Sequence, residues 1–168
     1  MQETPQQYTQ RILGQLGGRD PMEILAATPR QMARSVSGVS RKKLVQRPAP
    51  DKWSAAEIMA HMADTELVAG FRIRLVLGAS GTPVQAFDQD AWAHFSDYAT
   101  QDPRLSLEAL RVARERTLRL LKGLPRDSWE FYGLHTERGK ETVRRMVEML
   151  AGHDLNHMQQ IRERLAKK

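Results

Sequence analysis

The chain of 168 residues contains no cysteine, which excludes disulfide bonds, thiolate metal sites and cysteine nucleophiles. It also has no apolar run close to the roughly 18 residues that a membrane-spanning helix needs. Its N-terminal stretch is polar and lacks the apolar core of a secretory signal peptide. These absences predict a cytoplasmic protein that has no membrane partner.

Signals for β-strands are also scarce, because alternating runs rich in valine, isoleucine, threonine and tyrosine are nearly absent. The hydrophobic content of 40% and the charged content of 27% are typical of a globular protein. A chain of 168 residues suffices for one hydrophobic core and is short for two. We therefore expect an all-α protein with a partly helical N-terminal extension at residues 1–19 and a single domain at residues 20–168.

Basic residues outnumber acidic ones by 26 to 20, which gives a net charge of +6. Such an excess can indicate binding to nucleic acid or to another acidic partner. Here arginine and lysine are spread along the whole chain, and the densest group, at residues 41–43, is short. This distribution favours solvated helix faces and disfavours a nucleic-acid partner.

The first long helix is predicted to begin at Thr28. Pro29 suits the first helical position, and Gln31 completes a Thr-x-x-Gln capping box. The helix is expected to run to about Val45, before Pro48 forces the chain into an extended linker.

Three further long helices follow. The second has the clearest start, because Ser54 and Glu57 form a capping box before an apolar run that ends at Gly78. The third is predicted at residues 102–124 and the last at residues 141–165, each with an apolar stripe at helical spacing.

The connections between these helices are unequal. Residues 79–101 are long enough to include a short helix capped by Asp88, and residues 125–140 are interpreted as a loop rich in aromatic residues and glycine. Four amphipathic helices around one core indicate a four-helix bundle with short extra helical segments.

Three histidines fall on helical stripes that are otherwise apolar. His153 and His157 are four residues apart, so both imidazoles lie on one face of the last helix. His61 lies on the inner stripe of the second helix. Three nitrogens from two helices could hold a divalent metal and leave one coordination position open.

Each of the five histidines also has a simpler interpretation than metal binding. One inward histidine is most simply a core residue that is hydrogen-bonded to a neighbour. Three on inner faces favour a metal site. His94 is interpreted as a surface or packing residue. His135 is interpreted as a loop residue, with a place over the mouth of the site as the alternative.

The carboxylates near these histidines are ambiguous. Asp64 lies three residues after His61 and could orient a ligand histidine or accept a proton, although a surface salt bridge is the default. Glu57 is already explained by helix capping. Asp154 is turned by about 100° from its neighbour His153 and carries the same ambiguity as Asp64.

Several segments resemble one known family. The stretches WSAAEIMAHMADTE, FRIRLVL, FDQDAWA and GHDLNHMQQI occur in the order found in the DinB/YfiT-like superfamily, and the likeness spans roughly residues 20–165. The resemblance implies an up-down-down-up helix bundle in which His61, His153 and His157 hold a divalent metal. Members described as metal-dependent hydrolases and as transferases or isomerases that use low-molecular-weight thiols occur in this superfamily, and many have no established activity.

A metal on three neutral histidines supports two reactions. A water in the open position would ionise near pH 7 and give hydrolysis, whereas a thiol held there as thiolate would give S-transfer. Zinc or nickel is expected first, with iron or manganese as alternatives. We therefore expect a metal-dependent enzyme acting on a small-molecule substrate, either a hydrolase or a thiol-dependent S-transferase.

The competing hypothesis is a non-catalytic helical module for binding or structure, with DNA binding as a third option. Structural zinc usually has four protein ligands. Only a carboxylate such as Asp64 could supply the fourth here, which favours the open site. A homodimer is also expected, because bundles of this type commonly pair through helix faces.

Overall fold

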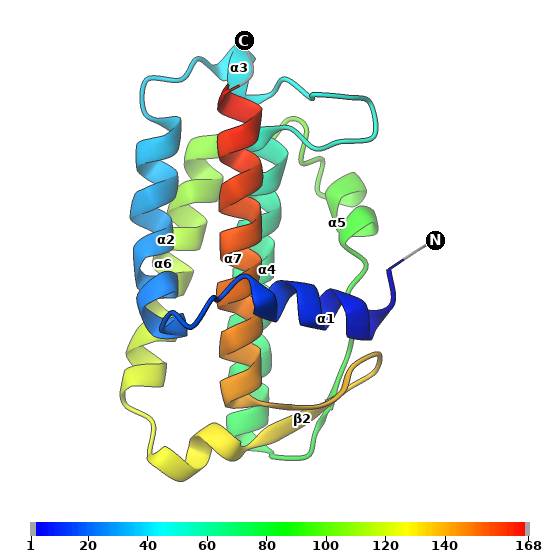
Figure 1. The fold of residues 1–168 in the computed structure, drawn as a ribbon, viewed down its shortest axis with the longest axis vertical. Coiled ribbons are helices and arrows are strands. Elements are labelled where there is room, and N and C mark those ends of the chain that lie inside the picture. The colour runs from blue at the N-terminus through cyan, green and yellow to red at the C-terminus, as the bar shows by residue number, and fades with distance from the viewer. Residues whose placement is uncertain (1–2, 167–168) are drawn as a thin grey trace.

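Four long helices lie side by side in the computed structural model, which describes residues 3–166 (Figure 1). Helices α2 and α7 run in one direction and α4 and α6 in the other, which gives an up-down-down-up order. Helix α4 packs between α6 and α7, and α2 closes the ring against the same two helices. The expected all-α four-helix bundle is confirmed, with helices α2 (Pro21–Val36), α4 (Ala55–Gly78), α6 (Pro103–Lys122) and α7 (Val143–Ala166).

Shorter helical segments connect and flank the bundle. The short helix predicted after Asp88 is present as α5, and the Asp88 side chain accepts hydrogen bonds from the first turn. None of the helices within residues 3–166 combines the length and apolar character that crossing a membrane requires. The short segments are α1 (Pro5–Gly14), α3 (Arg41–Leu44), α5 (Gln89–Phe95) and the 3₁₀ helix η1 (Arg126–Glu130).

A small sheet closes one end of the bundle. It has the order β1-β2-β3, in which β1 (Pro83–Val84) pairs parallel with β2 (Tyr132–His135) and β2 pairs antiparallel with β3 (Gly139–Thr142). The interpretation of residues 125–140 as a loop is therefore wrong for β2 and the start of β3. These strands are too short to show a period, and tertiary packing selects them. A Cβ at Gly133 would lie 2.5 Å from Val84 Cγ2, so glycine lets β2 approach its neighbours.

The capping box predicted at the start of α4 is present in full. The Glu57 backbone N–H donates to Ser54 Oγ at 3.2 Å, and the Ser54 backbone N–H donates to Glu57 Oε2 at 2.8 Å. Arg47 also pairs with the Glu57 carboxylate, which is buried. These contacts fix the start of the helix that carries His61.

The predicted start of the first long helix at Thr28 is wrong. Helix α2 begins at Pro21, after the cap residue Asp20, and Pro29 lies inside it. The Thr28 hydroxyl donates to the Ile24 carbonyl at 3.0 Å instead of capping a helix. A proline in a helix interior normally costs stability, because the carbonyl four residues earlier loses its N–H donor.

The carbonyl freed by Pro29 belongs to Leu25, and it receives a different donor. Arg114 Nη1 of α6 donates to Leu25 O at 2.9 Å, so the polar group remains satisfied in the core. The predicted end at Val45 is also wrong, because α2 ends at Val36. The chain then turns through Gly38, whose φ of 73° suits glycine, before α3 begins.

Arg114 links all four long helices. Its Nε donates to Glu66 Oε2 of α4 at 2.7 Å, and its Nη1 donates to Asp154 Oδ2 of α7 at 2.7 Å, in addition to the bond to Leu25 O of α2. Arg114 is only 1% exposed, and both carboxylates are buried. Burial alone would lower the pKa of Arg114, but the charges of Asp154 and Glu66 outweigh burial and hold this pKa above its ordinary value.

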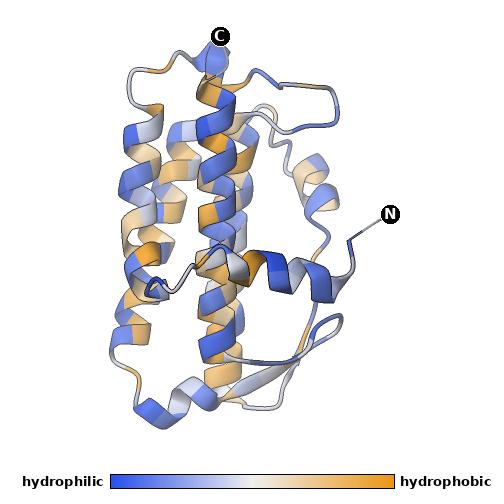
Figure 2. Cartoon of the chain, in the orientation of Figure 1, coloured by the Kyte–Doolittle hydropathy of each residue, from blue (hydrophilic) through white to orange (hydrophobic). Residues whose placement is uncertain are grey.

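This ionic network separates two apolar clusters of the core. One cluster includes Ile73, Leu121 and Val147 and lies toward the sheet. The other includes Met59 and Met158 and lies toward the start of α4. Figure 2 shows hydrophobic and hydrophilic residues alternating along the long helices. Polar groups of all four long helices therefore meet in one layer between the two clusters.

The N-terminal helix α1 packs across α7 (Figure 1). Ile12 of α1 is fully buried against Gly152 of α7. A Cβ at Gly152 would overlap the backbone carbonyl of Ile12, so the two helices approach as closely as glycine permits. This contact holds α1 beside the next residue of α7, His153.

Replacing Arg114 with Met tests the network. The change leaves two carboxylates buried without a cation, so we expect the free energy of unfolding to fall by about 3–5 kcal/mol. Arg111→Met is the matched control, since Arg111 lies one turn earlier on α6, is exposed, and pairs with Glu108 in solvent. Urea unfolding followed by circular dichroism measures both. Equal stability of the two variants would contradict the assigned role of the network.

Candidate metal centre

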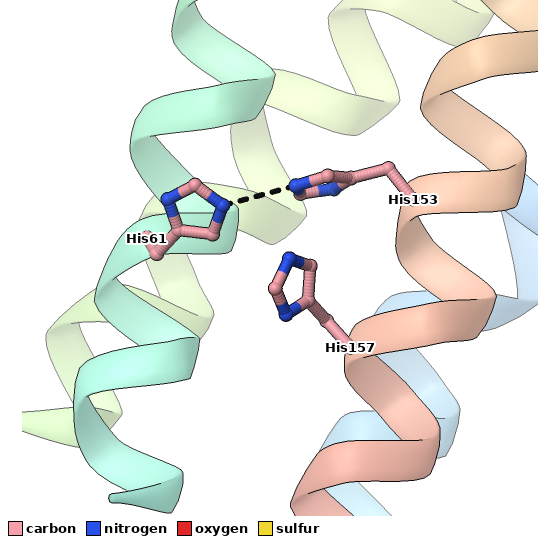
Figure 3. Close-up of side chains that lie close together, drawn as sticks. All are labelled: His61, His153 and His157. Carbon is pink, nitrogen blue, oxygen red and sulfur yellow. Dashed lines mark hydrogen bonds between the residues drawn. The ribbon is translucent and has the colours of Figure 1, made fainter. Parts of the chain in front are cut away.

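Three histidine side chains converge in the polar layer between α4 and α7 (Figure 3). His61 projects from α4, and His153 and His157 project from successive turns of α7. The Nε2 atoms of His61 and His153 are 2.9 Å apart. One candidate ligand atom from each of the three residues lies within 4.8 Å of the others. The three residues that sequence analysis grouped are thus brought together.

The position of the cluster follows from helix geometry. The i, i+4 spacing places His153 and His157 on one face of α7, with ring centroids 4.3 Å apart. His61 and His153 are 1% and 7% exposed, and His157 is partly exposed. The indole of Trp53 covers His61 from the side, with ring centroids 5.0 Å apart. The site is therefore largely shielded from water.

The environment keeps all three imidazoles neutral at pH 7. Burial, followed by the charge of His157, lowers the pKa of His61 to about 3. Burial lowers the pKa of His157 to about 4 and the pKa of His153 well below its ordinary value. A neutral imidazole keeps one nitrogen lone pair available, which is the form that binds metals.

Gln160 fixes the tautomer of His157. Its Oε1 atom lies 2.9 Å from His157 Nδ1, and an amide oxygen can only accept a hydrogen bond. The proton of His157 therefore resides on Nδ1, and the lone pair on Nε2 remains free. This arrangement matches the outer hydrogen bond that metal-binding histidines usually make.

The geometry fits a divalent ion. Three nitrogens at about 2.05 Å from one tetrahedral ion would be separated by about 3.4 Å. The Nε2 atoms of His61 and His153 are 2.9 Å apart, and the three candidate atoms lie within 4.8 Å of one another, so small ring rotations suffice. The Nδ1 atoms of His61 and His153 have no hydrogen-bond partner in the described part of the chain. Only a cation would use the lone pairs of all three rings together.

A cavity of about 470 Å³ leads to this cluster, and His61 and His153 form part of its lining. Met146, Met149 and Leu150 of α7 provide an apolar wall. Residues of α1, of the β2–β3 hairpin and of the segment before α5 complete the enclosure. The arrangement therefore gives a small molecule access to the histidines.

The carboxylates considered from sequence have different partners. Asp64 accepts a hydrogen bond from the Tyr98 hydroxyl at 2.6 Å, so its action on a ligand histidine or as a proton acceptor stays a prediction. Asp154 is buried and paired with Arg114, so the default of a surface salt bridge is wrong for it. His94 is exposed on α5, as expected.

His135 is the cavity residue that sequence reasoning placed incorrectly. It lies on β2 and is 3% exposed, so the interpretation as a plain loop residue is wrong. It lines the same cavity as His61 and His153, in agreement with the alternative that it overhangs the site. Alternation along YGLH puts Gly133 and His135 on the same inward face, but four residues are too few to reveal a strand.

Comparisons with known proteins agree with this fold. The profile of the DinB superfamily matches residues 24–161. A protein of Oceanobacillus iheyensis named "Putative metal-dependent hydrolase" is 23% identical over 133 residues, which cover 79% of this chain and 77% of that protein. "Putative metal-dependent hydrolase YfiT" of Bacillus subtilis is 23% identical over 144 residues, which cover 84% of this chain and 80% of YfiT.

The solved structure of YfiT from Bacillus subtilis is described as having "an unusual four-helix bundle topology". It superposes on this chain with a TM-score of 0.78 and 20% sequence identity, covering 88% of this chain and 87% of YfiT. The likeness supports the same helix arrangement in both proteins.

Proposed function

The chain belongs to the DinB superfamily, and we propose that it is a metal-dependent hydrolase whose ion is held by His61, His153 and His157. The observation that carries the proposal is the convergence of three neutral imidazoles beside an accessible cavity. The names of the relatives from Oceanobacillus iheyensis and Bacillus subtilis support the same reaction class.

A divalent ion held by His61, His153 and His157 would supply Lewis-acid chemistry and would activate water for hydrolysis. The protein's own groups would bind and orient the substrate. Thr65 Oγ1 lies 3.4 Å from His61 Nε2 and lines the cavity, so its hydroxyl can hydrogen-bond a polar group that arrives there. Met146, Met149 and Leu150 would bind an apolar part of the substrate and exclude water beside it.

Zinc or nickel is the proposed ion, with iron or manganese as alternatives, because imidazole ligands suit several divalent metals. Among the described residues, the cluster able to hold an ion consists of three histidines and includes no carboxylate. A structural zinc site normally has a fourth protein ligand. The donor set therefore supports a reactive site over a purely structural one.

Metal binding tests the proposed ligand set. His157→Ala and His153→Ala each remove one ligand nitrogen, so we expect affinity for Zn²⁺ to fall by more than about 100-fold. This loss exceeds the one typically caused by removing a residue that only hydrogen-bonds to a metal ligand. His94→Ala is the control, because His94 is exposed on α5. Elemental analysis and competition titration measure stoichiometry and affinity. Unchanged zinc content in both site variants would remove these residues from the ligand set.

The outer hydrogen bond of His157 generates a separate prediction. Gln160→Leu removes the acceptor at Nδ1, and we expect zinc affinity to fall by about 10–100-fold. Gln159→Leu is the adjacent control, since Gln159 is exposed and bonds Glu163. The same competition titration compares them. An identical affinity in both variants would show that the contact does not orient the ring.

Activity tests the reaction class. Protein loaded in turn with zinc, nickel, manganese and iron is screened against carboxylic esters, amides and phosphoesters, with and without low-molecular-weight thiols and electrophiles. We expect metal-dependent hydrolysis that His153→Ala abolishes and His94→Ala retains. Turnover that requires the thiol would contradict the hydrolase and support the alternative, a thiol-dependent S-transferase. Absence of both reactions with a loaded site would support a non-catalytic module.

A further inference from the structure

The cavity extends well beyond the histidines along one face of α4. His61, Thr65, Ala69 and Arg72 all line it, at spacings of four, four and three residues. Such spacings keep side chains on one helix face. Arg72 lies eleven positions after His61, which corresponds to a rise of about 16 Å along the axis. The cavity therefore has a histidine end and a distant end at Arg72.

His135 lines this cavity and carries a buried hydrogen-bond donor. Its Nδ1 accepts a hydrogen bond from the Glu137 backbone N–H at 3.2 Å, so the proton of the neutral ring resides on Nε2. The Nε2 atom is buried and has no hydrogen-bond partner within residues 3–166. Burial lowers the pKa of His135 to about 4, so the ring stays neutral at pH 7. A buried donor without an acceptor is costly unless a ligand supplies one.

Arg72 presents a cation to the same cavity. Its Nη2 donates to the Gln85 carbonyl, and its guanidinium lies over the Phe87 ring, 5.7 Å from the centroid. Within the described chain, no carboxylate comes into ion-pair distance of Arg72. Arg138, by contrast, is held by Glu141 through contacts of 2.7 and 2.9 Å. Arg72 is thus the guanidinium with donor capacity left for a ligand.

The type of anion follows from the surrounding charges. The carboxylates of Glu137 and Glu141 also line this part of the cavity and partly offset the positive charge. They favour a monoanion over a doubly charged phosphate. A guanidinium fork also matches the planar geometry of a carboxylate.

We propose that Arg72 and His135 form a subsite for a substrate carboxylate, at the end of the cavity distant from the three histidines. The apolar wall of Met146, Met149 and Leu150 lies along the cavity and would contact a hydrocarbon segment between the two ends. The inference rests on the proposed hydrolase and narrows its substrate to an amphipathic carboxylic acid whose reacting bond is remote from the carboxylate.

Binding of 5-phenylpentanoate and of its neutral amide, measured by isothermal titration calorimetry on zinc-loaded protein, tests the subsite without turnover. We expect the acid to bind at least about tenfold more tightly than the amide. Arg72→Met should abolish this preference, and His135→Phe, which keeps the ring volume but removes the donor, should reduce it. Arg74→Met is the matched control and should retain it, because Arg74 is exposed on α4 and does not line the cavity.

Equal binding of acid and amide by the unmodified protein would overturn the subsite. A preference for the acid that persists in Arg72→Met would also overturn it, because the carboxylate would then bind elsewhere, for example at the metal. The proposed hydrolase fails separately. Binding of the acid that depends on Arg72, without metal-dependent hydrolysis of any ester, would support the subsite and contradict the proposed hydrolase. Hydrolysis by the unmodified protein that His153→Ala abolishes, together with equal binding of acid and amide, would support the hydrolase and overturn the subsite.

Discussion

The buried guanidinium of Arg114 is the constraint on which the arrangement of this protein depends. It bonds one group from each of the other three long helices, namely Leu25 O, Glu66 and Asp154. A buried charge tolerates little displacement of its partners, because each lost contact leaves an unpaired polar group in the core. The network therefore sets how far each helix is shifted and rotated relative to its neighbours. Apolar packing on both sides supplies stability but would tolerate more variation.

The same constraint places the histidines. Asp154 directly follows His153 on α7, and Glu66 lies five residues after His61 on α4. Fixing the two carboxylates on one arginine therefore brings the two imidazoles within hydrogen-bond distance of each other. The neutral rings then share the polar layer with the network and border a cavity enclosed by α1, α7 and the small sheet. Fold and site are thus two consequences of one layer of buried polar residues.

The sequence predicted the features that local chemistry decides. The capping box at Ser54 and the i, i+4 histidine pair on α7 can each be recognised within a few residues. The meeting of His61 with that pair was implied by the resemblance to the DinB/YfiT-like superfamily, because helical spacing does not show which helices are adjacent. Features that depend on distant partners were missed. Pro29 resembles a helix start until Arg114 is seen to bond the carbonyl that it frees. The β2–β3 hairpin, and with it His135, depends on packing around Gly133 that no local period reveals.

The central claim is that three imidazole nitrogens from α4 and α7 surround one divalent ion. X-ray absorption spectroscopy of zinc-loaded protein tests it most directly, because the fine structure reports the type, number and distance of the ligand atoms. The account predicts three histidine nitrogens at about 2.0–2.1 Å and one further light atom in a four-coordinate shell. A shell of six oxygens without imidazole scattering would contradict it.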